Sequence, residues 1–139
     1  MKASETIWRA LSVRQPYAEL ILRGEKTIEW RSRTTRIVGE RFWIYASLTP
    51  VKDGGIWSED LERAEALPWI RELGLARRLF GEGLSLPRGV IVGSAAIARV
   101  VPPTGSHGMY GWELCDVERM ERPRRPEGHP QPVWFNAFG

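Results

Sequence analysis

A change from a short helix to a charged strand at Gly24 constrains the fold of this chain more than any other feature of its sequence. Before the glycine, Tyr17, Leu20 and Ile21 form an apolar stripe at i, i+3 and i+4. Pro16 can open a helix at this point. Gly24 stands where a left-handed C-terminal cap is wanted. We therefore expect a helix of about two turns that ends at Gly24.

From Thr27 the sequence changes to a period of two, which is typical of a strand. Ile28 and Trp30 share one face and are expected to pack inward. The opposite face carries polar and charged residues, namely Thr27, Glu29, Arg31 and Arg33. Glu29 and Arg31 can form an ion pair there, with Lys26 at the mouth of the strand placed to reach the same carboxylate. Alternating acid and base is also typical of a solvated strand face with weak ion pairs.

Further strands are expected at residues 8–13, 42–46, 89–101, 110–117 and 133–138, with a bend near Gly93. Residues 42–46 are apolar on both faces, so another element should cover them. The expected cover is a helical section at 57–80 that Pro68 divides into two helices. The Pro/Arg stretch 121–126 is interpreted as a solvated loop. These patterns predict an α+β fold of five to six strands with about three helices.

The length of 139 residues fits one domain, 1–139, in which 57–80 is a helical insertion. No apolar run approaches the ~18 to 20 residues that span a bilayer, and the N-terminal residues lack the apolar centre of a secretory signal. We interpret the chain as cytoplasmic and without a membrane partner. The net charge of +3 permits an anionic partner such as RNA, and no signal is specific to DNA. The sequence leaves the oligomeric state open.

Metal and cofactor sites are not indicated by the sequence. His107, Cys115 and His129 lack any close metal-ligand spacing. No Gly-rich phosphate loop follows a strand in the required way. We therefore predict no bound metal and no cofactor.

The segment 24–31, GEKTIEWR, fits the pattern G-x-K-x-x-E-x-R and resembles the signature of the ASCH domain family. Residues 11–18, LSVRQPYA, resemble the strand-to-helix entry of the family, and residues 44–47, IYAS, resemble its next strand. The resemblance implies a small PUA-like β-barrel whose motif residues line a cleft between the barrel and its first helix. Family members are generally proposed to bind RNA or nucleotides. The ligand-binding residues expected on this basis are Gly24, Lys26, Glu29, Arg31, Arg14, Tyr17 and Ser47. Tyr17, Tyr45 and Trp134 are expected at the cleft rim, where bases can stack.

An enzymatic function is the alternative that the resemblance leaves open. Some bacterial relatives are amidohydrolases that release acetate from acetylated cytidine with a Lys, a Thr and a Glu, and others have been proposed as ribonucleases. Lys26 matches the hydrolase lysine, whereas Glu29 stands where the hydrolase has its Thr, and the hydrolase Glu aligns with no position here. Lys26 and Glu29 are the expected catalytic residues if the chain is an enzyme. A protein-interaction module is a third interpretation.

Overall fold

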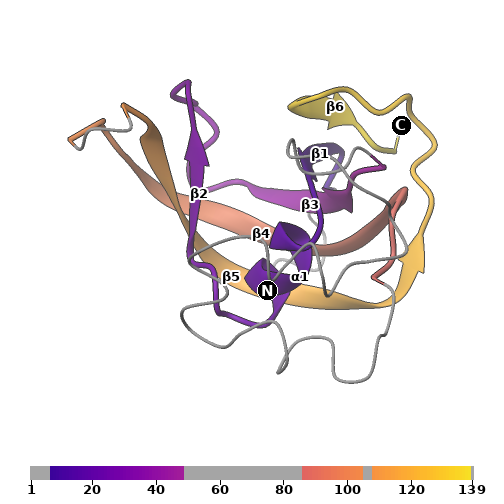
Figure 1. Ribbon diagram of the computed structural model, residues 1–139. Coiled ribbons are helices and arrows are strands. Elements are labelled where there is room, and N and C mark those ends of the chain that lie inside the picture. The colour runs from indigo at the N-terminus through magenta and orange to yellow at the C-terminus, as the bar shows by residue number, and fades with distance from the viewer. Residues whose placement is uncertain (1–6, 49–85, 105–107, 139) are drawn as a thin grey trace.

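The computed structural model describes residues 7–48, 86–104 and 108–138. Its elements in chain order are β1 (Arg9–Val13), α1 (Tyr17–Leu22), β2 (Ile28–Arg31), β3 (Arg41–Ala46), β4 (Val90–Val101), β5 (Tyr110–Arg124) and β6 (Trp134–Asn136). The strands form one six-stranded sheet in the order β2-β5-β4-β3-β1-β6. Only the pairing of β1 with β3 is parallel among these neighbours. The sheet curls into a half-barrel with β2 and β6 as its two edges (Figure 1), in agreement with the barrel-like fold that the resemblance implied.

The fold is mostly β, because α1 is the only helix within the described residues. The expected total of about three helices is therefore not supported. The helical section predicted at 57–80 lies outside the described residues. Within the described part of the chain, no helix is long and apolar enough to cross a membrane.

The core lies on both faces of β3, as the apolar run 42–46 predicted. Phe42 and Ile44 belong to the main apolar cluster, together with residues of β1, α1, β4 and β5. Tyr45 points to a second cluster on the other face, where its ring lies 5.3 Å from the ring of Phe135. In the described structure, residues of the C-terminal segment such as Phe135 and Phe138 pack on this second face. The apolar C-terminus thus supplies cover that we had expected from residues 57–80.

Gly24 ends the helix in the way the sequence predicted. Its φ of +76° is left-handed, a conformation that glycine adopts without steric cost. The amide of Gly24 donates a 3.0 Å hydrogen bond to the carbonyl of Ile21, and the amide of Lys26 donates a 3.1 Å bond to the carbonyl of Leu20. The chain consequently turns directly from α1 into β2 and delivers Lys26 beside the first residues of the strand.

The long strands β4 and β5 carry the bend predicted at Gly93. The register between them shifts between Ile91 and Gly93, and a Cβ on Gly93 would lie 2.4 Å from the carbonyl oxygen of Glu118. The loop expected at residues 121–126 was wrong, because β5 continues to Arg124, which pairs with Ile91. Pro123 lies in the part of β5 where the register with β4 shifts. Proline has no backbone N–H to donate, but the hydrogen-bond ladder between the strands needs no donor at this position.

Candidate functional site

The charged face of β2 points into the half-barrel. Glu29 pairs in register with Trp112 of β5, and such cross-strand partners share a face of the sheet. Trp112 is buried in the main core, and Glu29 accordingly is only 7% exposed. Trp30, on the opposite face, is 42% exposed, so the expectation that it packs inward was wrong. The acid–base alternation therefore does not mark a solvated strand face.

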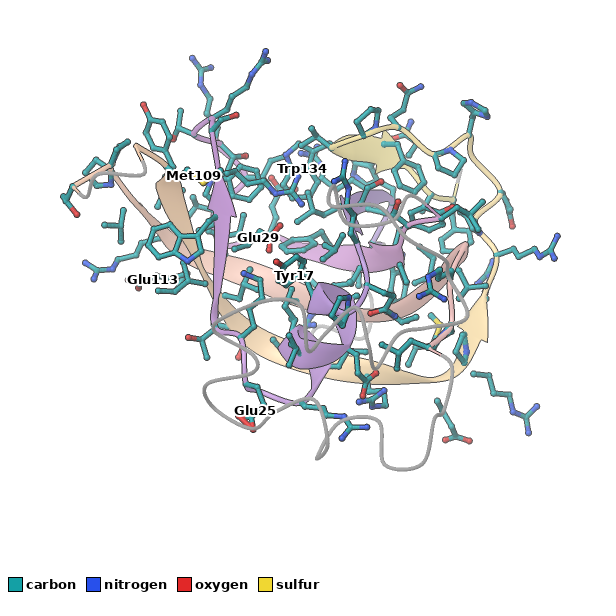
Figure 2. The ribbon with its side chains drawn as sticks, in the orientation of Figure 1. Tyr17, Glu25, Glu29, Met109, Glu113 and Trp134 are labelled. Atoms are coloured by element: carbon teal, nitrogen blue, oxygen red, sulfur yellow. The ribbon has the colours of Figure 1, made fainter. Side chains whose placement is uncertain are left out.

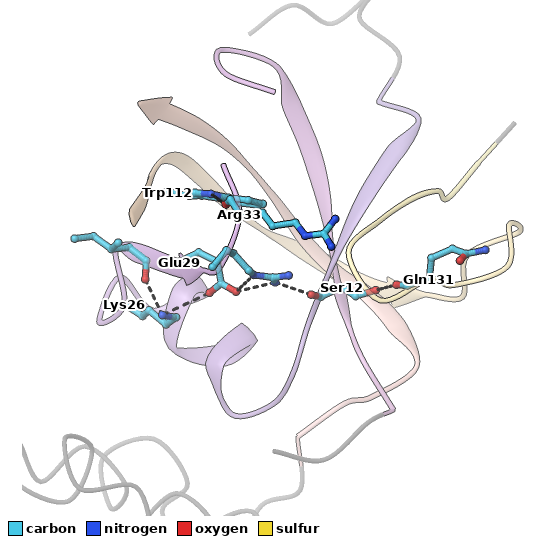
Figure 3. A network of polar contacts seen from close by, with 8 residues as sticks. Ser12, Lys26, Glu29, Arg33, Trp112 and Gln131 are labelled. Atoms are coloured by element: carbon cyan, nitrogen blue, oxygen red, sulfur yellow. Dashed lines mark hydrogen bonds and ion pairs between the residues drawn. The ribbon is translucent and has the colours of Figure 1, made fainter. Parts of the chain in front are cut away.

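Glu29 lies between two cations (Figure 3). Its Oε2 accepts a 2.7 Å hydrogen bond from Nε of Arg31, which is the ion pair predicted from the sequence. Its Oε1 lies 3.5 Å from Nζ of Lys26, and Nζ donates a 2.6 Å hydrogen bond to the carbonyl of Ile28. The side chains of Lys26, Glu29 and Arg31 are 11%, 9% and 19% exposed. Pairing of this kind is what allows a carboxylate to remain charged away from water.

The same chain of contacts crosses the half-barrel between its edges. Nη2 of Arg31 donates a 2.8 Å hydrogen bond to the carbonyl of Ser12 in β1. The hydroxyl of Ser12 donates in turn to the carbonyl of Gln131, just before β6, at 2.5 Å. Figure 3 shows the resulting path from Lys26 to Gln131. Neither Ser12 nor Gln131 could be identified from the sequence, because the accepting atoms are backbone carbonyls that every residue type carries.

Burial lowers the pKa of Lys26 from its usual range; the negative charge of Glu29 opposes this shift, and the positive charge of Arg31 adds to it. Nζ of Lys26 also lies 5.3 Å from the centre of the Tyr17 ring, and Cζ of Arg31 lies 5.5 Å from that of Trp112. Each cation thus has an aromatic neighbour as well as the carboxylate. Lys26 consequently gives up its proton more readily than an ordinary surface lysine.

Two cavities adjoin this cluster. The first, called the main cavity, has a volume of about 890 Å³ and is bounded by β2, the start of α1, the ends of β1 and β3, and residues 129–132. The second, called the side cavity, has a volume of about 480 Å³ and is bounded by residues 25–30 with Tyr17 and Met109. Tyr17, Glu29, Trp30 and Met109 line both cavities. Figure 2 shows Tyr17 and Glu29 beside β2, with Met109 near the C-terminal end of that strand.

Most of the predicted site residues meet at these cavities. Those lining the main cavity are Arg14, Tyr17, Glu29, Arg31, Ser47 and the expected rim residue Tyr45, and those lining the side cavity include Lys26. Gly24 lines neither cavity. Its contribution to the site is the turn from α1 into β2, which positions Lys26. Trp134, expected at the rim, lines neither cavity; it is partly buried and stacks on the core residue Trp112 with a ring separation of 5.9 Å. Met109 and residues 129–132 also line the main cavity, although none of them was predicted as a ligand-binding residue, because they are distant from the motif along the chain.

Metal-binding groups were sought among the same residues. Across the ranges that the structure describes, no three His, Cys, Asp or Glu side chains are grouped so as to hold a metal ion. His107 lies outside these ranges, and Cys115 is half-buried on β5.

The comparisons with known proteins bear on the family of the chain. No curated protein matches the chain. The sequence model of the ASCH domain family matches residues 11–136, which include β2, α1 and every residue that lines the two cavities. The chain therefore belongs to the ASCH domain family.

Proposed function

We propose that this ASCH domain binds RNA or a nucleotide in the main cavity, with Lys26, Glu29 and Arg31 as the recognition cluster. The central support is the position of Glu29, a carboxylate that is 7% exposed, paired with cations and set in a cavity wall. Burying a charge is costly unless its partners are well placed, so a purely structural ion pair gains little from this position. ASCH domains are generally RNA-binding and PUA-like, which agrees with the proposal.

The chemistry of the cluster suits a nucleobase. Within the described part of the chain, the contact of Oε1 of Glu29 is with Nζ of Lys26 at 3.5 Å, which is longer than an ordinary hydrogen bond. A carboxylate in this state accepts hydrogen bonds from the amino or imino group of a base, or from a ribose hydroxyl. Arg14, which is exposed at the main cavity, supplies a cation for phosphate. Tyr17 supplies an aromatic face on which a base can stack.

Hydrolysis of a modified nucleoside, such as acetylated cytidine, is the second candidate, and the state of Lys26 favours it. Burial lowers the pKa of this lysine, and a lysine that acts as a general base or nucleophile needs such a shift. Glu29, 3.5 Å away, can orient the amine or accept its proton. The two functions differ in the effect of Lys26→Ala, which weakens affinity in a binder but abolishes turnover in a hydrolase. The same variant tests the ribonuclease alternative, because Lys26→Ala would then abolish cleavage of RNA.

The deciding experiment is a two-dimensional NMR titration of the labelled domain with cytidine, acetylated cytidine and a short single-stranded RNA. The products in each sample are then analysed by chromatography. We expect shifts at Lys26, Glu29, Arg31 and their neighbours without any product. Accumulation of cytidine from the acetylated form, or of shortened RNA, would establish the enzyme. If no ligand moved these resonances at millimolar concentration, both nucleotide functions would be rejected.

A further inference from the structure

Trp30 occupies an unusual position for a large aromatic side chain. It lies on β2, an edge strand, and faces away from the core with 42% of its surface exposed. Edge strands ordinarily carry short or charged side chains, because exposed apolar groups there promote association. Trp30 nevertheless is not on open surface, because it lines both the main cavity and the side cavity. An exposed aromatic side chain at the wall of two cavities is therefore within reach of a ligand in either of them.

The backbone of β5 sets the position of the Trp30 ring. Trp30 pairs in register with Gly111, and a Cβ on Gly111 would lie 3.0 Å from Cζ3 of the tryptophan. The indole thus rests over a residue that has no side chain, with Ile28 beside it on the same strand face. A ring that is seated before binding loses little conformational entropy when a second ring stacks on it.

The side cavity also has the charge that a nucleotide requires. Lys26 lines the side cavity and Arg31 lines the main cavity, while Glu29 lines both. Each cavity therefore offers a cation to the phosphodiester that joins two consecutive nucleotides. A volume of about 480 Å³ lies within the range of ordinary ligand pockets, roughly 300–1,000 Å³. Because the two cavities share a wall, consecutive bases of one nucleic-acid strand can reach both of them.

We propose that Trp30 is the stacking platform of a second base site, and that the ligand is a single-stranded oligonucleotide of at least two nucleotides. This inference rests on the proposed function. One base occupies the main cavity at Glu29 and Arg31, and the adjacent base lies in the side cavity against the indole of Trp30. Stacking on an aromatic ring is tolerant of base identity, so this second site adds affinity with little sequence preference. The domain should consequently discriminate against free nucleosides and mononucleotides.

The test compares ligands of one and two nucleotides by isothermal titration calorimetry. The probes are the four nucleoside 5′-monophosphates and the dinucleotides CpC, UpU, ApA and GpG. We expect the best dinucleotide to bind about tenfold to a hundredfold more tightly than the best mononucleotide, as base stacking on an aromatic ring allows. Trp30→Leu should remove most of this advantage, so that the variant binds the dinucleotide little more tightly than the mononucleotide. Trp30→Phe should restore part of it.

Trp8→Leu is the matched control. Trp8 is 45% exposed, much like Trp30, but it lines neither cavity. This variant should retain the full advantage of the dinucleotide. If mononucleotides and dinucleotides bind the unaltered protein equally well, the second site is refuted and the main cavity stands alone. A Trp30→Leu protein that keeps the dinucleotide advantage also overturns the inference. If neither ligand class binds, the proposed function fails and the second site fails with it.

Discussion

Nη2 of Arg31 lies 2.8 Å from the carbonyl oxygen of Ser12 and 2.7 Å from Oε2 of Glu29. One guanidinium therefore joins β2 to β1, which are not neighbours in the sheet, and at the same time holds the carboxylate of the recognition cluster. The contact spans the half-barrel from the edge strand β2 to β1, and all three of its residues line the main cavity. A guanidinium can make both bonds because its donors form a planar fork.

Arg31→Lys should therefore be harmful although it conserves the charge. A lysine ammonium cannot reproduce the fork, and the carbonyl of Ser12 loses its donor. We expect a loss of about 1–3 kcal/mol in the free energy of unfolding, measured by urea denaturation. Arg99→Lys is the control, because Arg99 forms an exposed pair with Glu113 outside both cavities. Equal stability of the Arg31 and Arg99 variants would show that the Ser12 contact does not support the fold.

Lys26 should titrate below the usual range of lysine, since burial disfavours its charged form. Glu29 opposes that shift, so Glu29→Gln should lower the pKa of Lys26 still further. The measurement is an NMR titration of lysine Cε resonances, which is simplified because Lys2 and Lys52 are the only other lysines. A pKa for Lys26 that stays the same or rises in the Glu29→Gln protein would contradict this description of the cluster.

The same shift makes a prediction about stability at alkaline pH. Because the folded pKa of Lys26 lies below its unfolded value near 10.5, the unfolded chain binds more protons in the interval between them. The contribution of Lys26 to stability should therefore increase as the pH rises through that interval. Burial raises the pKa of Tyr45, which acts in the opposite sense, so the informative quantity is the difference between the unaltered protein and Lys26→Met. A difference that is constant with pH would exclude the predicted linkage.

Glu19 should contribute to stability above acidic pH. It is buried on α1, and its carboxylate accepts hydrogen bonds from Arg119 of β5 and from Arg23. Burial raises the pKa of Glu19, but the hydrogen bonds and charges of Arg119 and Arg23 outweigh it, so the net pKa is lowered. The stabilisation is then present above the unfolded value near 4.5 and is lost as the pH falls through the folded pKa.

Glu19→Gln should accordingly flatten the acidic limb of the stability curve and cost about 1–3 kcal/mol at neutral pH. This range is smaller than that for a fully buried pair, because the arginine side chains are 37% and 50% exposed. Chemical denaturation at several pH values measures both effects. Glu127→Gln removes the exposed partner of Arg124 and serves as the control that leaves the curve unchanged. An acidic limb as steep in Glu19→Gln as in the unaltered protein would disprove the role of Glu19.

Gly24→Ala isolates the backbone cost of the turn. The glycine has a φ of +76°, and a Cβ at this position would meet no atom within 4 Å. The loss of stability, about 1–2 kcal/mol, should therefore come from the left-handed conformation alone. Gly24→Asn should cost less, because asparagine tolerates this conformation better than alanine does. If thermal or urea denaturation found the Gly24→Ala protein to be more stable than the Gly24→Asn protein, this explanation would be refuted.

The features that the sequence predicted correctly depend on the local chain. The turn at Gly24 and the bend at Gly93 follow from the freedom of glycine, and the pair of Glu29 with Arg31 follows from the period of a strand. The direction of the β2 faces was predicted wrongly, because it depends on the partner strand: Glu29 lies opposite the buried Trp112, a residue remote in sequence. The extension of β5 through 121–124 likewise depends on β4. Pairings of this kind leave no periodic signal in either segment.

The most direct test of the recognition cluster is the affinity of Glu29→Gln for a fluorescently labelled single-stranded RNA, measured by anisotropy at ~0.1 M salt. Removing a negative charge makes the protein more basic, so electrostatic attraction alone predicts equal or tighter binding. Glu113→Gln changes the net charge by the same amount outside both cavities and should behave in that way. We predict that Glu29→Gln weakens binding about tenfold, because a charge-assisted acceptor is lost. Binding by Glu29→Gln as tight as that of Glu113→Gln would contradict recognition by this cluster.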